Sequence, residues 1–163
     1  MELNVDGRAV FAHTGGQDFT EDKPALVFIH GAGNDHTYWG LQTRFFAHHG
    51  YSVLVPDLPG HGRSKGPAPE NVEDYTSWLW RFLDAVGAQK AALVGHSMGS
   101  LITLAAAAQQ PERMLALGLA GTSDYMQVHP DLLELAAADD PKAFELITEW
   151  GFGKTAHIGG HQA

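Results

Sequence analysis

Gly95-His96-Ser97-Met98-Gly99 stands between the apolar run Ala91-Ala92-Leu93-Val94 and the helix-forming run Leu101-Ile102-Thr103-Leu104-Ala105-Ala106-Ala107-Ala108. The stretch fits the pattern G-x-S-x-G at a strand-to-helix turn, which is typical of a nucleophilic serine. Such a turn strains the backbone of its serine, and only small residues two positions away let the strand and the helix approach closely. Gly95 and Gly99 provide that space, so we predict that Ser97 is a nucleophile. The alternative is an ordinary strand-loop-helix connection.

Short apolar runs predict the strands of the fold. Asp6-Gly7 favours the tight turns that join two antiparallel strands. Residues 25–29 are a continuous apolar run, as expected of a central parallel strand that is buried on both faces. Two more strands are predicted at residues 52–55, stopped by Pro56, and at residues 114–119.

Helical segments alternate with these strands. Asn71 is a good N-cap for a helix through Val86, whose apolar residues recur every three or four positions and which Gly87 ends. Other helices are predicted at residues 39–48, closed by Gly50, at residues 131–138, and at residues 141–150 with Asp140 as the N-cap. This alternation implies an α/β fold, in which a mostly parallel sheet carries helices on both faces.

A glycine-rich turn, His30-Gly31-Ala32-Gly33, directly follows the strand predicted at residues 25–29. Ligands of such sheets bind at the carboxyl ends of the strands, so backbone N–H groups of this turn can face the same cleft as Ser97. Two fixed donors would stabilise the oxyanion of acyl transfer, each by about 2.7–4 kcal/mol. We predict that the amides of Ala32 and Met98 form this oxyanion hole. The alternative is a turn kept for its geometry alone.

With Asp57-Leu58-Pro59-Gly60-His61-Gly62-Arg63-Ser64, these motifs follow the order of the α/β-hydrolase family, and the chain resembles the N-terminal part of such a protein. The resemblance implies a hydrolase of ester, thioester, lactone or carbon-carbon bonds, and a mainly structural role for residues 57–64. It implies a core at residues 1–121, the start of a helical lid with a loose tail at residues 122–163, and C-terminal strands that this chain lacks. Residues 115–119 would then form an exposed sheet edge, which invites a homo-oligomer.

The catalytic base is not evident from the sequence. Members of the family carry their triad in the chain order serine, acid, histidine, and the later two positions are expected beyond this chain. Asp124 falls where some lidded members carry the acid, and its alternative is a polar residue of the lid connection. Five histidines are candidates for the base. His96 is expected to point away from the cleft, His30 to be buried and structural, and His61 to brace the Asp57 turn. His157 and His161 are expected to be solvated.

Composition limits the classes of partner. The chain has 163 residues, about one domain, with a formal net charge of -9 and no cysteine. Nucleic acids and anionic membrane surfaces are disfavoured because their binding relies on clustered Lys and Arg. No apolar run approaches the roughly 18–20 residues that cross a bilayer. The acidic N-terminus has no signal core, so we expect a cytoplasmic protein.

No metal or other cofactor is expected. His48-His49, His36 with Asp35, and His157 with His161 lack the i, i+4 spacing and the third ligand of a zinc enzyme. The turn at residues 31–33 lacks both the G-x-G-x-x-G spacing and the lysine of nucleotide-binding loops.

Two hypotheses about function follow. In the first, the protein is a hydrolase whose Ser97 attacks a small-molecule ester or a related acyl or carbon-carbon bond, and water resolves the acyl-enzyme. In the second, the chain is a truncated, non-catalytic α/β module that binds small acyl compounds or self-associates. The lid shapes the substrate pocket of such hydrolases, so the motifs name a reaction class and no substrate.

Overall fold

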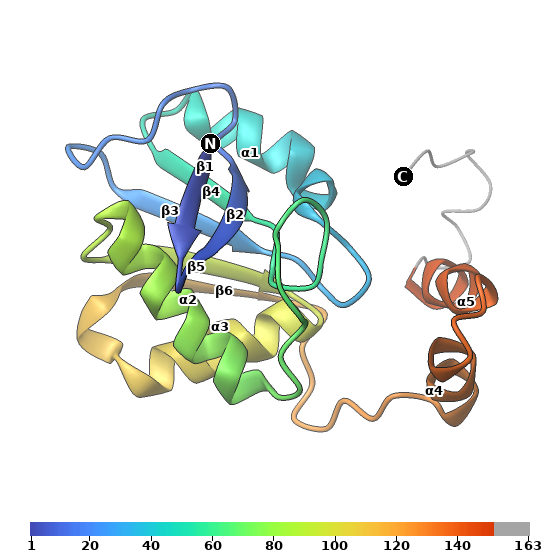
Figure 1. The fold of residues 1–163 in the computed structure, drawn as a ribbon. Coiled ribbons are helices and arrows are strands. Elements are labelled where there is room, and N and C mark those ends of the chain that lie inside the picture. Colours follow the sequence, from blue (N-terminus) through green and yellow to red (C-terminus); the bar gives the residue numbers. More distant parts are fainter. Residues whose placement is uncertain (152–163) are drawn as a thin grey trace. The chain divides into compact units, whose positions relative to one another are not determined.

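The computed structural model describes residues 1–151, and Figure 1 shows their helices and strands. The chain divides into two compact units, Met1–Thr122 and a second that begins at Ser123. The strands are β1 (Glu2–Val5), β2 (Arg8–His13), β3 (Ala25–Ile29), β4 (Ser52–Pro56), β5 (Ala91–His96) and β6 (Met114–Ala120). The first unit also has the helices η1 (His36–Trp39), α1 (Gly40–Ala47), α2 (Val72–Val86), α3 (Met98–Gln109) and η2 (Pro111–Arg113), and the second has α4 (Pro130–Ala137) and α5 (Lys142–Gly151).

The strands form one six-stranded sheet in the order β1-β2-β4-β3-β5-β6. The pairs of β4, β3, β5 and β6 are parallel, and β2 is antiparallel to both of its neighbours. Helices cover both faces, α1 on one and α2 with α3 on the other. The predicted α/β class with a mostly parallel sheet is therefore confirmed.

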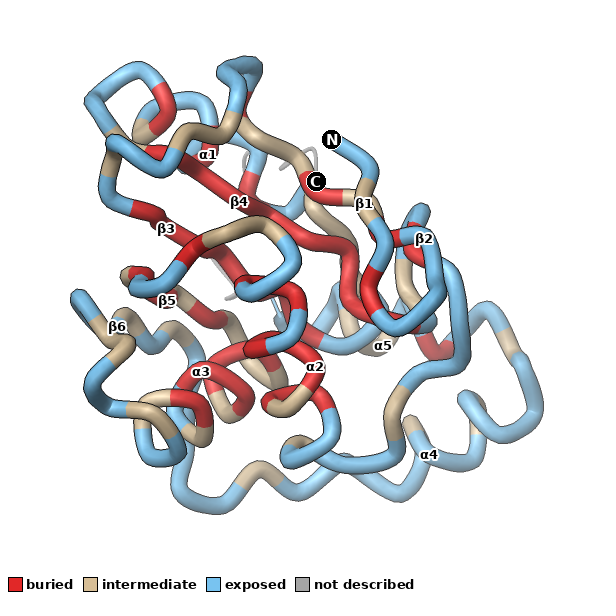
Figure 2. The backbone as a smooth tube through the Cα atoms, turned by 60° about the vertical axis from the view of Figure 1, so that its left-hand side comes forward, coloured by how far each residue is buried: buried red, intermediate tan, exposed pale blue. Residues whose placement is uncertain are grey.

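The centre of the sheet is β3, which lies between β4 and β5. All five of its residues are buried, as Figure 2 shows for β3 and β4. Leu26 and Phe28 belong to the core cluster on the α1 face, whereas Val27 and Ile29 belong to the cluster under α2 and α3. This alternation of side chains between two covered faces explains the continuous apolar run in the sequence.

Local signals in the sequence set several boundaries correctly. Asp6 and Gly7 turn the β1–β2 hairpin with φ angles of 53° and 79°, and the Gly7 amide donates to Asn4 Oδ1 at 2.8 Å. The side chain of Asn71 accepts from the Asp74 amide at 2.8 Å at the start of α2. Gly87 ends that helix in the left-handed conformation with a φ of 86°. The predicted hairpin and both of the caps predicted for α2 are confirmed.

Other boundaries differ from the predictions. The first helix region begins earlier than residue 39, because Asp35 accepts from the Thr37 amide at 2.8 Å and starts η1. Helix α1 ends at Ala47 and its C-cap, His48, is right-handed, whereas Gly50 turns the chain later with a φ of 90°. Pro56 is the last residue of β4 rather than the residue that stops it, since its partner there is Ala12 of β2.

Among the described strands, β6 lies at the edge of the sheet and pairs with β5 alone. Leu115, Leu117 and Leu119 on this strand are 51%, 45% and 41% exposed. Figure 2 shows β6 in the colours of intermediate and exposed residues, unlike β3 and β4. The strand predicted at residues 114–119 is thus present, and it lies at an edge of the sheet as expected. Among the described helices, none combines the length and the apolar character needed to cross a membrane.

Candidate active site

Ser97 lies between the end of β5 and the start of α3 with φ 53° and ψ -122°. A residue with a side chain rarely adopts a positive φ, and such strain costs about 1–3 kcal/mol. Hydrogen bonds hold this conformation on both sides of the turn: the Ser97 amide donates to the Ala120 carbonyl at 3.0 Å, and the Ser100 amide donates to the Ser97 carbonyl at 2.8 Å. The strained strand-to-helix turn that the sequence predicts is therefore present in the structure.

Glycine is required at both flanking positions, Gly95 and Gly99, because a Cβ there would clash with neighbouring atoms. A Cβ on Gly95 would overlap the Gly99 carbonyl and would lie 2.5 Å from Thr103 Oγ1. A Cβ on Gly99 would lie 2.6 Å from the carbonyl oxygen of His30. Both separations are too short for a carbon atom, so strand and helix can approach this closely only with glycine at these positions.

The turn at residues 30–33 lies against the serine. A Cβ on Gly31 would lie 3.1 Å from Ser97 Cβ and 3.3 Å from the His96 carbonyl oxygen. Ala32 follows Gly31 and is exposed. Met98 is the first residue of α3, so its amide has no acceptor inside the helix. Two backbone segments that carry candidate oxyanion donors therefore border the same side chain.

His30 links the Gly31 turn to the next loop. Its ring is fully buried, and its Nε2 accepts a hydrogen bond from the Leu58 amide at 3.1 Å. Since Nε2 accepts, Nδ1 must carry the proton and donate to the Gly31 carbonyl at 2.8 Å. Burial lowers the pKa of His30 to about 4. The prediction of a buried, hydrogen-bonded histidine at this position is confirmed.

Asp57 is the anchor of the loop at residues 57–64. Its carboxylate is fully buried and accepts from the His36 amide at 2.7 Å, from His36 Nδ1 at 2.9 Å and from the Arg63 amide at 2.8 Å. From the sequence, His61 is predicted to brace Asp57, and His36 is a candidate only for a metal ligand with Asp35. His61 Nδ1 instead donates to the Pro59 carbonyl at 3.1 Å, and the ring centre of His61 lies 5.1 Å from that of His30.

The arrangement of Asp35, His36 and Asp57 brings three ligand-type atoms within 4.8 Å of one another. Each of these groups already has a structural role, because Asp35 caps η1 and His36 donates to Asp57. The cluster is accounted for by these hydrogen bonds, which fix the loop rather than leave ligand atoms free.

The side chain of His96 packs against Tyr38 and the chain near Gly121. Its ring stacks on Tyr38 with 4.5 Å between ring centres, and a Cβ on Gly121 would lie 3.5 Å from the ring. Its Nδ1 is buried and has no hydrogen-bond partner in the described part of the chain, and burial lowers the pKa of the ring. Within residues 1–151, no hydrogen bond joins the Ser97 hydroxyl to another side chain.

The remaining catalytic candidates from the sequence are Asp124, His157 and His161. Asp124 belongs to the second unit, where it is exposed and its Oδ1 accepts from the Ser123 hydroxyl at 3.3 Å. His157 and His161 lie outside the described residues.

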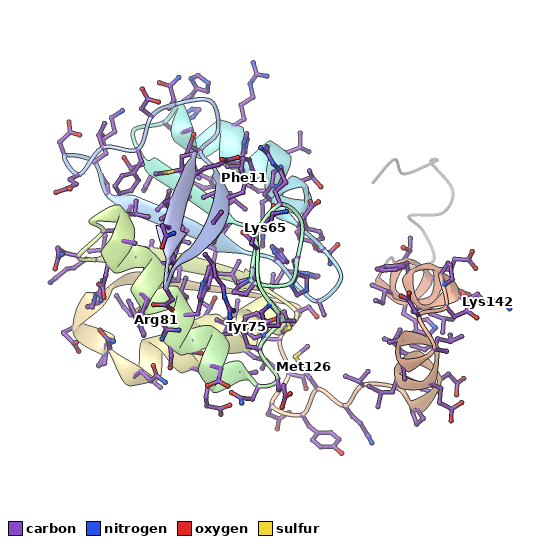
Figure 3. The ribbon with its side chains drawn as sticks, viewed as in Figure 1. Phe11, Lys65, Tyr75, Arg81, Met126 and Lys142 are labelled. Atoms are coloured by element: carbon purple, nitrogen blue, oxygen red, sulfur yellow. The ribbon has the colours of Figure 1, made fainter. Side chains whose placement is uncertain are left out.

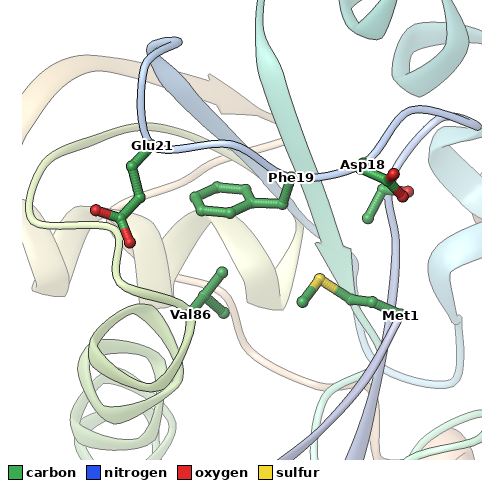
Figure 4. A pocket seen from close by; sticks show the side chains of 6 residues that line it. Met1, Asp18, Phe19, Glu21 and Val86 are labelled. Atoms are coloured by element: carbon green, nitrogen blue, oxygen red, sulfur yellow. The ribbon is translucent and has the colours of Figure 1, made fainter.

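One cavity of the first unit is remote from these motifs. It measures about 680 Å³ and is lined by Met1, Thr14, Asp18, Phe19, Glu21 and Val86. Figure 4 shows Phe19 extending between Glu21, Val86 and Met1. These residues precede β3 or end α2, so they gather at the amino end of the parallel strands, whereas Ser97 follows the carboxyl end of β5. The cavity therefore belongs to the opposite end of the sheet.

Comparison with known proteins agrees with this geometry. The alpha/beta hydrolase fold family matches residues 24–158. An (E)-2-((N-methylformamido)methylene)succinate hydrolase of Acinetobacter baylyi is 36% identical over 53% of this chain and 33% of its own length. An epoxide hydrolase of Caballeronia sordidicola is 34% identical over 76% of this chain and 40% of its own length. The chain thus spans less than half the length of these relatives.

Solved structures give the same result. Epoxide Hydrolase A from Mycobacterium thermoresistibile has a TM-score of 0.65 at 27% identity, over 84% of this chain and 44% of that protein. A hydrolase from Pseudomonas aeruginosa PA01 has a TM-score of 0.79 at 24% identity, over 99% of this chain and 62% of that protein, and at this identity it shows the fold alone. On the family match, the sheet topology and the turn at Ser97, the chain belongs to the α/β-hydrolase fold family.

Proposed function

We propose that this protein is a hydrolase that cleaves a small-molecule ester or a related acyl or carbon-carbon bond, with Ser97 as nucleophile. The observation that carries the proposal is the backbone of Ser97, a non-glycine residue held at φ 53° between a buried strand and a helix. Strain of this kind persists only where the surroundings enforce it, and it concentrates at functional sites. Both relatives are named hydrolases, which supports hydrolysis as the class of reaction.

The proposed chemistry is nucleophilic acyl transfer. Ser97 Oγ forms a bond to the acyl carbon while its proton passes to a base. The carbonyl oxygen becomes an oxyanion that accepts hydrogen bonds from the amides of Ala32 and Met98. Collapse of this intermediate releases the leaving group with a proton, and water then hydrolyses the acyl-enzyme. The acid role of Asp124 and the cytoplasmic location stay predictions of the sequence.

A second candidate function has its own support. Because no side chain of residues 1–151 is hydrogen-bonded to the Ser97 hydroxyl, the described part of the chain supplies no base to the serine. A non-catalytic module that binds small acyl compounds agrees with this observation. The two candidates differ in whether Ser97 reacts.

A fluorophosphonate probe distinguishes the two candidates, since it forms a covalent bond only with an activated serine. The hydrolase hypothesis predicts one adduct per chain, assigned by peptide mass spectrometry to Ser97 and absent from Ser97→Ala. Ser77→Ala is the matched control, because Ser77 lies on the outer side of α2 and donates to its own helix at Glu73. It should label like the unmodified protein.

Imidazole, added as an external base, distinguishes a chain that lacks only the base from one whose serine is misplaced. If labelling of Ser97 is slow alone and faster with imidazole, the nucleophile and the oxyanion hole are in place and the base is external to this chain. The absence of a Ser97 adduct under both conditions contradicts the hydrolase hypothesis and favours the binding module.

A further inference from the structure

A second cavity, of about 290 Å³, lies on the side of the first unit formed by the β1–β2 turn, the loop after Ser64 and the first half of α2. Neither the Ser97 turn nor the turn at residues 30–33 contributes to its lining. Three of the ten Lys and Arg residues of the chain, Arg8, Lys65 and Arg81, line it. Figure 3 labels Lys65 on the loop and Arg81 on α2.

The charge of this cavity opposes that of the chain as a whole. Two acidic residues, Asp6 and Asp74, also line it. Asp6 is paired with Arg81 at 2.6 Å, and Asp74 accepts from the Asn71 side chain at 2.9 Å. Among the described residues, Arg8 and Lys65 form no ion pair. Three cations and two carboxylates therefore line one cavity, which carries a net charge of +1 in a protein whose net charge is -9.

The backbone brings Arg8 and Lys65 side by side. The Lys65 amide donates to the carbonyl of Ala9, the neighbour of Arg8, at 2.9 Å. The side chain of Arg8 lies over Gly66, where a Cβ would come within 2.8 Å of both Arg8 Cδ and Nη1.

The rest of the lining is apolar. Trp78, Val5 and Val10 are 6%, 3% and 2% exposed, and they are joined by the rings of Pro59, Pro67 and Pro69. Small-molecule sites combine an apolar wall with a few positioned polar groups and have volumes of about 300–1,000 Å³, so this cavity suits a ligand at the small end of that range. An arginine matches a carboxylate in geometry as well as in charge.

We propose that this cavity is a binding site for a small organic carboxylate with an apolar body about the size of one aromatic ring. The carboxylate lies between Arg8 and Lys65, and the apolar body packs on Trp78 and the prolines. The site is separate from Ser97, so the proposal stands independently of the function proposed above.

Phenylacetate is the probe, added to the full chain at low ionic strength up to about 20 mM and followed by amide NMR. We expect saturable shifts at residues that line the cavity, and binding at least tenfold weaker for phenylacetamide, which lacks the charge, and for acetate, which lacks the ring. Arg8→Gln and Lys65→Gln should each weaken binding about threefold, and the double variant about tenfold, since each removes one exposed ion pair. All three variants replace exposed side chains, and their thermal unfolding shows whether they remain folded.

Arg44→Gln and Lys90→Gln are the matched controls, because both residues are exposed and lie outside the cavity. They should bind phenylacetate like the unmodified protein. The proposal is overturned if phenylacetate causes no saturable shifts, if its shifts map to other residues, or if phenylacetamide binds equally well. It is also overturned if the controls weaken binding as much as the Arg8 and Lys65 variants do.

Discussion

Ser97 has the least favourable backbone of the candidate site, with a φ of 53° and a ψ of -122°. Glycine reaches this region without a clash between Cβ and the backbone. We therefore expect Ser97→Gly to raise the free energy of unfolding by about 1 kcal/mol while removing the nucleophile. Denaturant unfolding measures the change. Ser77→Gly, inside α2, should instead destabilise by about 1 kcal/mol, and a loss of stability in Ser97→Gly would show that the turn is unstrained.

His30 makes stability depend on pH. Its pKa is about 4 in the folded protein, where burial disfavours the charged ring, and about 6.5 when unfolded. The unfolded chain therefore takes up the proton first, and the contribution of neutral His30 is complete above pH 6.5 and declines as the pH falls to about 4. The total decline is on the order of 3 kcal/mol.

Comparison with His30→Asn isolates this effect, because the other titrating groups, including His13 and His96, are common to both proteins. We expect the stability advantage of the unmodified protein over the variant to shrink between pH 7 and pH 4 in urea unfolding. A constant difference across that range would mean that His30 does not titrate as its burial requires.

At the scale of elements, the contact between β5 and α3 depends on the absence of side chains at Gly95 and Gly99. Gly95→Ala should cost about 3 kcal/mol or more of stability, because its Cβ would overlap the Gly99 carbonyl. Gly40→Ala is the matched control, since Gly40 is helical, with φ -55° and ψ -40°, and has nothing within 4 Å of its Cβ position. That substitution should stabilise the protein by about 0.5–1 kcal/mol. Equal thermal stability of the two variants would contradict the close approach.

The elements that the sequence predicted well carry their own local signal. The β1–β2 turn is specified by Asp6-Gly7, and α2 by Asn71 and Gly87 at its ends. The central strand β3 was recognisable because both of its faces are covered, which leaves only apolar residues in its sequence. Where one or two neighbouring residues determine the conformation, the sequence was sufficient.

The features that the sequence did not predict depend on contacts between distant segments. Asp57 and His36 are separated by 21 positions, and only the packing of η1 beside the end of β4 makes them partners. The stack of His96 on Tyr38 likewise joins β5 to η1. The Asp57 motif marked its loop as important, but no local pattern identifies which histidine reaches a buried carboxylate.

At the scale of the whole molecule, the edge strand β6 exposes three leucines and one side of its backbone. Such an edge can pair with a second copy of the chain. We expect this 163-residue chain to self-associate with rising concentration, and Leu117→Lys to shift it toward the monomer, because a charge on an edge opposes pairing.

Light scattering after size-exclusion chromatography measures this association. Leu41→Lys is the control, since Leu41 is 87% exposed on α1 and lies away from the edge. It should associate like the unmodified chain. A monomer at all concentrations would show that the β6 edge does not pair.

The central claim is that Ser97 and the amides of Ala32 and Met98 form one reaction site. The most direct measurement is a crystal structure of the chain after reaction with the fluorophosphonate, because the phosphonyl oxygen occupies the place of the oxyanion. The account predicts phosphorus bonded to Ser97 Oγ and its oxygen about 2.7–3.1 Å from both amide nitrogens. An adduct on another residue, or a phosphonyl oxygen turned away from both amides, would contradict it.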